Sequence, residues 1–259
     1  MPNIHYLLLF LFIYFMTSFN SYGQSKLFKE PVDISKVSIT TLDKFDLKGH
    51  YYIGEKHSGG VLLLHGCHSS QQAYRPLINL LKQDNLHILS YDFRGYGDSQ
   101  SERFSQKKLR KSAENILAYQ TAMASLRAYW QSDALSAFEW LRSKVAKNKQ
   151  IAIVSVGCST RYAIGIAEAM HVDSLIIVTP EMDHYDKEHY KNLADKPTYF
   201  ITTMHQLESY KTAKELFEWN GSLHSKMQIF KGSYIDHILI KKQKGLINDM
   251  AFWLSNNLN

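Results

Sequence analysis

The sequence predicts a doubly wound α/β sheet that begins with an antiparallel pair of strands. Two short runs rich in β-branched and aromatic residues, 37–41 and 47–53, flank a polar turn at Asp43-Lys44 and are typical of such a pair. Beyond them, continuous apolar runs of strand length alternate with helical patterns. Strands buried on both faces that alternate with helices indicate a mostly parallel sheet covered on both sides.

The remaining elements follow in order along the chain. The apolar runs predict six buried strands, at 61–64, 86–91, 151–156, 174–179, 198–203 and 226–230. The helical patterns predict helices at 72–83, 132–145, 160–170, 208–220 and 246–254. Because no internal repeat, low-complexity tract or linker interrupts this order, we expect one domain after the N-terminal leader.

Composition excludes several classes of protein. The 259 residues are 45% hydrophobic and 21% charged, with only 2 cysteines, which excludes a disordered, collagen-like or disulfide-framework protein. The net charge of +6 is too small for a nucleic-acid-binding surface. We therefore expect a globular protein that binds no nucleic acid.

Residues 1–23 predict a secretory signal peptide with cleavage after Gly23. Residues 7–16 are continuously apolar and residues 17–23 are small or polar. A spanning helix needs roughly 20 apolar residues, so this run is too short to cross a bilayer. No Lys or Arg precedes the run, and an uncleaved N-terminal anchor is the alternative. We expect a secreted or periplasmic domain of residues 24–259, with both cysteines outside the cytosol.

Residues 101–129 interrupt the alternation with a long, helix-prone and Lys-rich insertion. Its basic residues cluster at 107–111, and apolar residues follow at roughly helical spacing over 116–126. A surface insertion with a solvated charged face explains this pattern, and a small lid or a helix that binds a partner is the functional alternative.

Three segments together resemble the α/β-hydrolase family, especially the compact dienelactone-hydrolase and serine-peptidase-like esterases without a separate cap domain. Residues 61–67 match the strand that ends in His-Gly, residues 91–99 match the Asp-x-Arg-Gly-x-Gly-x-Ser turn, and residues 151–167 match the strand, turn and helix that carry the nucleophile. The resemblance implies an α/β-hydrolase fold, and it implies that the backbone N–H after His65-Gly66 supplies half of an oxyanion hole.

The nucleophile turn departs from the family pattern Gly-x-Ser-x-Gly. Residues 155–159 read Ser-Val-Gly-Cys-Ser, so Gly157 takes the nucleophile position and the hydroxyl is lost. In a second register Ser159 is the nucleophile, but Arg161 and Tyr162 then stand where the family has small residues. We favour the Gly157 register and keep Ser159 as the alternative.

The other members of a catalytic triad are incomplete. In this family the acid follows the strand that corresponds to 198–203, and residues 204–207 (Met-His-Gln-Leu) contain no carboxylate. Glu208 is the nearest acid, and we interpret it as a charge at a helix N-terminus. His237, after the last strand, is the candidate base, but no carboxylate is available to orient it.

The resemblance also brings the two cysteines together. In the Gly157 register, Cys67 and Cys158 hold the two positions whose N–H groups form the oxyanion hole, in a cleft that also includes His65 and His68. Neighbouring positions of this kind fall within the roughly 4.4–6.8 Å between Cα atoms that a disulfide spans. A Cys67–Cys158 disulfide is one hypothesis. Two small buried side chains, or a thiol nucleophile, are the others.

No pattern in the sequence indicates a cofactor or a metal. There is no Cys/His cluster with zinc-ligand spacing and no glycine-rich nucleotide loop. Three histidines, His184, His189 and His205, lie near predicted strand ends. Residues 184–186 and 188–189 contain groups that could ligate an ion, and a polar surface loop explains them more simply. We therefore predict an impaired hydrolase that binds an unidentified small ligand in its former cleft. The alternatives are an active serine hydrolase using Ser159 and His237, or an interaction protein using residues 101–129.

Overall fold

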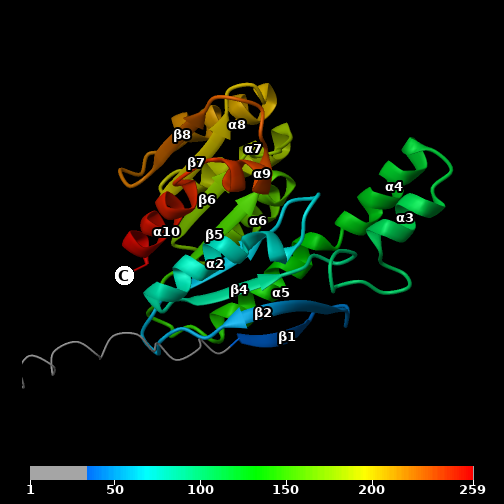
Figure 1. Cartoon of the computed structure of the whole chain (residues 1–259), viewed down its shortest axis with the longest axis horizontal. Coiled ribbons are helices and arrows are strands. Elements are labelled where there is room, and N and C mark those ends of the chain that lie inside the picture. The colour runs from blue at the N-terminus through cyan, green and yellow to red at the C-terminus, as the bar shows by residue number, and fades with distance from the viewer. Residues whose placement is uncertain (1–33, 259) are drawn as a thin grey trace, which may run out of the picture. The chain divides into compact units, whose positions relative to one another are not determined.

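A computed structural model describes residues 34–258, which form one eight-stranded sheet in the order β1-β2-β4-β3-β5-β6-β7-β8 (Figure 1). The strands are β1 (Ile34–Thr40), β2 (Asp46–Tyr52), β3 (Gly60–Leu64), β4 (His87–Tyr91), β5 (Ile151–Val156), β6 (Ser174–Val178), β7 (Thr198–Thr203) and β8 (Lys226–Phe230). β2 is antiparallel to both β1 and β4, and all other pairs are parallel. The predicted mostly parallel sheet with an antiparallel start is confirmed.

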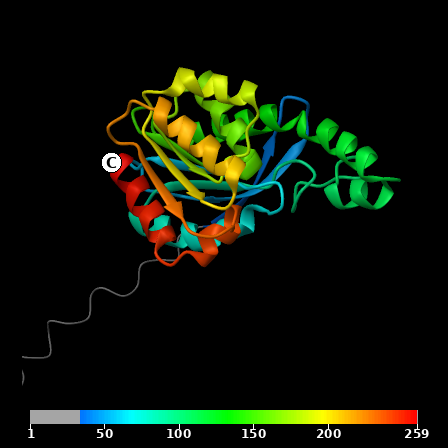
Figure 2. The ribbon, with the colours of Figure 1, turned by 90° about the horizontal axis from the view of Figure 1, so that it is seen from above.

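Helices cover both faces of this sheet. They are α2 (Arg75–Leu81), α3 (Gln106–Ser112), α4 (Ile116–Arg127), α5 (Trp130–Arg142), α6 (Thr160–Ala169), α7 (His184–Tyr190), α8 (Leu207–Trp219), α9 (Asp236–Lys242) and α10 (Leu246–Asn257). α5, α6 and α8 pack on one face, whereas α2 and α10 lie against each other on the opposite face (Figure 2). Within residues 34–258, no helix combines the length and apolar character needed to cross a bilayer. The predicted signal peptide, residues 1–23, lies outside the described residues.

Three local expectations were wrong. β8 is not buried on both faces, because it is an edge strand whose residues are mostly half-exposed. His184 and His189 lie on α7 rather than in a loop, because Asp183 caps that helix by accepting the N–H of Asp186 at 2.9 Å. His237 lies in the first turn of α9 rather than in a loop.

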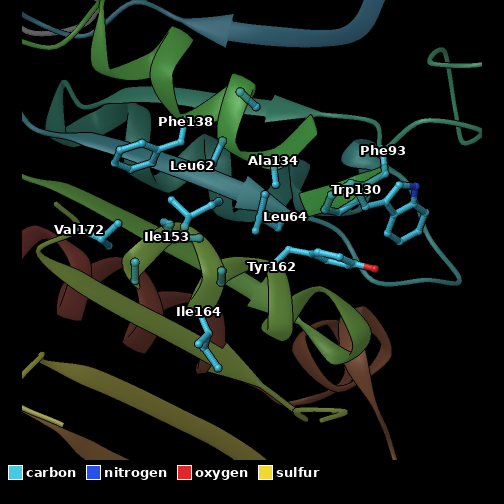
Figure 3. Packing of buried hydrophobic residues seen from close by; sticks show 14 of the residues in the cluster. Leu62, Leu64, Phe93, Trp130, Ala134, Phe138, Ile153, Tyr162, Ile164 and Val172 are labelled. Carbon is cyan, nitrogen blue, oxygen red and sulfur yellow. The ribbon is translucent and has the colours of Figure 1, made fainter. Parts of the chain in front are cut away.

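The core lies between the sheet and α5 and α6. Figure 3 shows Leu62 and Leu64 of β3 with Ile153 of β5, gathered against Ala134 and Phe138 of α5. All five side chains are fully buried. Burial of strand residues on both faces explains why their sequence reads as continuous apolar runs and not as an alternating pattern.

Residues 101–129 form α3 and α4, a helical hairpin that projects from the body of the protein (Figures 1 and 2). Its root surrounds Arg94, which is fully buried. The guanidinium donates to Asp133 at 2.6 and 3.1 Å and to Asp43 at 2.5 and 2.7 Å. It also lies within 5.0 Å of three ring centroids, those of Phe45, Phe104 and Tyr129. This cluster fixes the hairpin, the β1–β2 turn and α5 to one cation.

Candidate functional site

The turn after β5 is built on Gly157. The strand ends at Val156, a short 3-10 turn covers Gly157–Ser159, and α6 begins at Thr160. Gly157 has φ +57°, in the left-handed region that glycine adopts without steric cost. Ser159 instead has φ −78° and ψ −9°. The sharp turn therefore has Gly157 at its apex, as in the register favoured from sequence.

Ser159 is directed into the protein. Its side chain is fully buried, and its Oγ lies 3.0 Å from the carbonyl oxygens of Leu64 and Val156. The same oxygen accepts the N–H of Val156 at 2.9 Å. The hydroxyl thus joins the ends of β3 and β5, and within residues 34–258 no side-chain base is hydrogen-bonded to it.

The space beside Gly157 is filled by Asp236. A Cβ placed on Gly157 would lie 2.5 Å from Asp236 Oδ1, and one placed on Gly66 would lie 2.9 Å from Oδ2. Thr179 Oγ1 donates to Asp236 Oδ1 at 2.9 Å and accepts the Asp236 N–H at 2.9 Å. The carboxylate of Asp236 therefore fills the space that a nucleophilic side chain at position 157 would enter.

Three loops meet at this point in left-handed backbone conformations. Besides Gly157, Thr179 has φ +44° and Asp236 has φ +51°. Such angles are uncommon for residues other than glycine, especially for a β-branched threonine, and cluster at functional sites. The Glu181 N–H donates to the Gly157 carbonyl at 3.3 Å and ties the loop after β6 to the turn.

The electrostatics of this cluster centre on Asp236, which is 8% exposed. Burial raises the pKa of its carboxyl to about 6, because the charged form loses water. The hydrogen bond from Thr179 opposes that shift, the Glu181 carboxylate adds to it, and His68 opposes it. A carboxyl with a raised pKa at the end of a sheet is a common property of functional sites.

The side chain of His237 packs on an aromatic ring. Its ring packs edge-on against Tyr74, with ring centroids 4.5 Å apart. Both ring nitrogens are buried, and neither has a hydrogen-bond partner in the described part of the chain. Burial, helped by the nearby His65, lowers the pKa of His237 to about 3. The imidazole therefore remains neutral at pH 7, and no carboxylate orients it among residues 34–258.

Cys67 and Cys158 form a disulfide in the structure, with Cα atoms 5.9 Å apart. Cys67 follows β3 and Cys158 follows β5, two strands that pair directly. The proximity that the family resemblance implied is therefore confirmed. A bonded sulfur cannot act as a thiolate nucleophile.

The two other cleft histidines differ in role. His65 is fully buried, with Nδ1 2.8 Å from the Gly66 carbonyl and Nε2 accepting the Phe93 N–H at 3.0 Å. These partners assign the neutral tautomer with a proton on Nδ1, and burial lowers the pKa of this ring. His65 thus joins the ends of β3 and β4, whereas His68 is exposed.

Sequence reasoning missed Asp236, Thr179 and Glu181. Asp236 stands directly before His237, and a single sequence does not indicate which of two adjacent side chains enters the cleft. Thr179 and Glu181 follow β6, which nothing in the sequence connects with the turn at Gly157. As to metals, residues 34–258 contain no group of three or more His, Cys, Asp or Glu suited to hold one.

Comparisons with known proteins agree with this architecture. The family model described as serine aminopeptidase, S33, matches residues 55–183. No curated protein matched the chain. Among solved structures, an esterase of Pyrococcus furiosus is 17% identical with a TM-score of 0.63, over 88% of this chain and 92% of that chain.

Two further structures give the same result. A dienelactone hydrolase from Anabaena variabilis is 17% identical with a TM-score of 0.62, over 87% of this chain and 96% of its own. A predicted CIB-like hydrolase from Thermoplasma acidophilum is 15% identical with a TM-score of 0.60, over 87% of this chain and 100% of that chain. Identities this low speak to the fold alone. With its sheet order, its turn at Gly157 and these matches, the chain belongs to the α/β-hydrolase family.

Proposed function

We propose that this protein is an exported α/β-hydrolase-fold protein that has lost serine-hydrolase chemistry and acts by binding a small ligand. One observation carries the proposal: the nucleophile position is Gly157, and the Asp236 carboxylate fills the space beside it. Acyl transfer by a serine needs a hydroxyl, an adjacent base and a group that orients the base. The hydroxyl of Ser159 is instead hydrogen-bonded to backbone groups of Val156 and Leu64, and the His237 ring packs on Tyr74.

Fluorophosphonate labelling tests the loss of chemistry, because these probes react with activated serines. We expect no labelling of the wild-type protein, with a known serine hydrolase as the positive control. Labelling that Ser159→Ala abolishes would restore the serine-hydrolase alternative. Labelling that persists in Ser159→Ala would reveal another nucleophile and would also overturn the proposal.

The former cleft is the proposed place of binding. Its rim combines the exposed His68, the exposed Glu181 and the buried carboxyl of Asp236 beside the Cys67–Cys158 bridge. A thermal-shift screen of small esters, their acids and dipeptides checks this idea. We expect a stabilising compound whose effect is lost in His68→Ala or Glu181→Gln. No stabilising compound, or one that is insensitive to both substitutions, would refute binding at this rim.

Export is proposed from the first 23 residues of the sequence, and the Cys67–Cys158 bridge supports it because disulfides persist in oxidising compartments. The expected mature protein begins at Gln24. Mass spectrometry of protein recovered from a secreted or periplasmic fraction measures this directly. A full-length mass in the membrane fraction would favour the uncleaved anchor.

A protein partner at the α3–α4 hairpin is a second candidate function, because Ile116 and Leu117 are each 69% exposed on α4. Residues 101–129 also carry six Lys or Arg and two Glu, a net +4 of the chain's +6. A partner with an acidic, partly apolar surface matches this chemistry. Replacing Ile116 and Leu117 by serine should abolish co-purification of such a partner, and it leaves the buried Met123 and Leu126 of α4 in place, so the sheet remains folded.

A further inference from the structure

A cavity of about 580 Å³ lies where the end of α4 meets α6 and α7. None of the turn and cleft residues Gly157, Cys158, Asp236 and His237 lines it, so it is separate from the former catalytic cleft. Small residues make room for it on both sides: Ala124 on α4 and Ala128 directly after it, and Gly165 on α6. At Gly165 an added Cβ would lie 2.5 Å from Gln131 Oε1.

Arg127 carries an unmatched positive charge at this cavity. Its Nε is buried and has no hydrogen-bond partner among residues 34–258, and no carboxylate there lies within ion-pair distance of its guanidinium. The guanidinium contacts the Tyr96 phenol and lies 5.9 Å from the centroid of the Trp130 ring. A half-buried guanidinium in this state lacks the anion that normally satisfies its donors.

The other charged groups at the cavity are already paired. Arg161 lies 3.1 Å from Asp186 and 3.6 Å from Asp183. Glu168 lies 2.7 Å from His189 Nδ1 and accepts from Asn192 at 2.7 Å. The charge left without a partner is therefore that of Arg127, which calls for a single negative group.

Aromatic rings complete the lining. Tyr162 packs against Trp130 with ring centroids 5.6 Å apart, and Figure 3 shows its hydroxyl directed away from the apolar cluster. Both Arg127 and Arg161 act electrostatically on that phenol. At the rim, Tyr185 is 69% exposed and meets the His189 ring edge-on at 4.4 Å. An exposed ring at the rim of a cavity that also holds a cation favours a ligand with a flat apolar body and a negative group.

We propose that this cavity binds a small organic anion, with a carboxylate or phosphate group on Arg127 and a flat ring against Tyr185. The site goes beyond the proposed function, because it shares no residue with the turn at Gly157 and does not depend on whether hydrolysis is lost. Benzoate and phenyl phosphate are suitable probes, since they share the ring and differ in the anionic group. Benzamide is the neutral control of similar shape.

The test is titration followed by amide chemical shifts on the full folded protein. We expect saturable binding of benzoate or phenyl phosphate, with shifts at Gly165 and Tyr185, and weaker binding of benzamide. Arg127→Gln should lower the affinity about tenfold or more, because a charge-assisted hydrogen bond is lost. Arg110→Gln on the exposed face of α3 removes the same charge from the same hairpin and should change the affinity less than about twofold.

A second variant keeps the proposal testable if Arg127→Gln disturbs folding. Ala128→Leu leaves Arg127 in place and narrows the cavity beside it, so it should also weaken binding. Three results would overturn the proposal: no saturable binding of either anion, equal binding of benzamide, or unchanged affinity in both Arg127→Gln and Ala128→Leu. The contrast between benzoate and phenyl phosphate decides whether the anionic group is a carboxylate or a phosphate.

Discussion

Replacing Gly157 by alanine should destabilise the protein through two separable effects. The backbone at φ +57° disfavours a side chain, which costs about 1–2 kcal/mol for a non-glycine residue. The new Cβ would also lie 2.5 Å from Asp236 Oδ1 and displace that carboxylate from Thr179. Loss of a hydrogen bond to a charged group costs about 1.5–3 kcal/mol. We therefore expect the free energy of unfolding to fall by about 2.5–5 kcal/mol.

Urea unfolding of four proteins separates the two effects: wild type, Gly157→Ala, Asp236→Ala and the double variant. In the Asp236→Ala background the carboxylate is absent, so Gly157→Ala should cost only the backbone part, about 1–2 kcal/mol. The matched control is Gly245→Ala, at φ +87° with no atom within 4 Å of its added Cβ. That substitution should also cost only the backbone part.

Two results would refute this reasoning. The first is additivity of Gly157→Ala and Asp236→Ala within about 0.5 kcal/mol, which is the behaviour of independent sites. The second is a cost for Gly157→Ala no larger than that for Gly245→Ala. Either would mean that the Asp236 carboxylate does not occupy the space beside the turn.

Three further predictions concern the disulfide, the buried cation and pH. Replacing Cys67 and Cys158 by serine should lower the free energy of unfolding by about 4–5 kcal/mol for a loop of this length. Reductant should lower the urea midpoint of wild type to that of the variant, and two free thiols on alkylation of unreduced, denatured protein would contradict the bridge. Asp133→Ala should cost about 1.5–3 kcal/mol in urea unfolding because the buried Arg94 loses its hydrogen bonds to one carboxylate and keeps only those to Asp43, whereas a cost under about 1 kcal/mol would place Arg94 in contact with water. Because burial raises the folded pKa of Asp236 to about 6, the stability that its protonated form contributes is complete below about pH 4 and is lost as the pH rises through 6. Between pH 4 and 7 the free energy of unfolding should therefore fall by about 3 kcal/mol less in Asp236→Asn than in wild type. An equal pH dependence in the two proteins would contradict the raised pKa of Asp236.

The fold was predictable because its signals are local and repeated. Runs such as 151–156 and 174–179 are apolar over the length of a strand, which is what burial on both faces requires. β8 was misread because Met227, Ile229 and Phe230 give an edge strand the composition of a central one. α7 was missed because its seven polar and aromatic residues lack an apolar period, and its start depends on the Asp183 cap.

The site was only half predictable, for a different reason. The turn at Gly157 and the approach of Cys67 to Cys158 follow from motif positions along adjacent strands. Asp236 enters the turn from 79 residues further along the chain, held by its hydrogen bonds with Thr179 and by an unusual backbone angle. Contacts between loops this far apart in the chain produce no periodic pattern of residues that a single sequence could reveal.

The surroundings of Arg94 have a consequence for how the projecting hairpin can change. Phe104 before α3 and Tyr129 after α4 both pack on the same guanidinium, so the hairpin leaves and rejoins the body at one anchored root. Insertions or a transplanted loop at the tip, between α3 and α4, would leave the eight strands and their register untouched, whereas the end of α4 has to be kept because Met123 and Leu126 are buried in the core. The tip of the hairpin is thus an exchangeable module, and the chain can acquire a new surface there without rebuilding its scaffold.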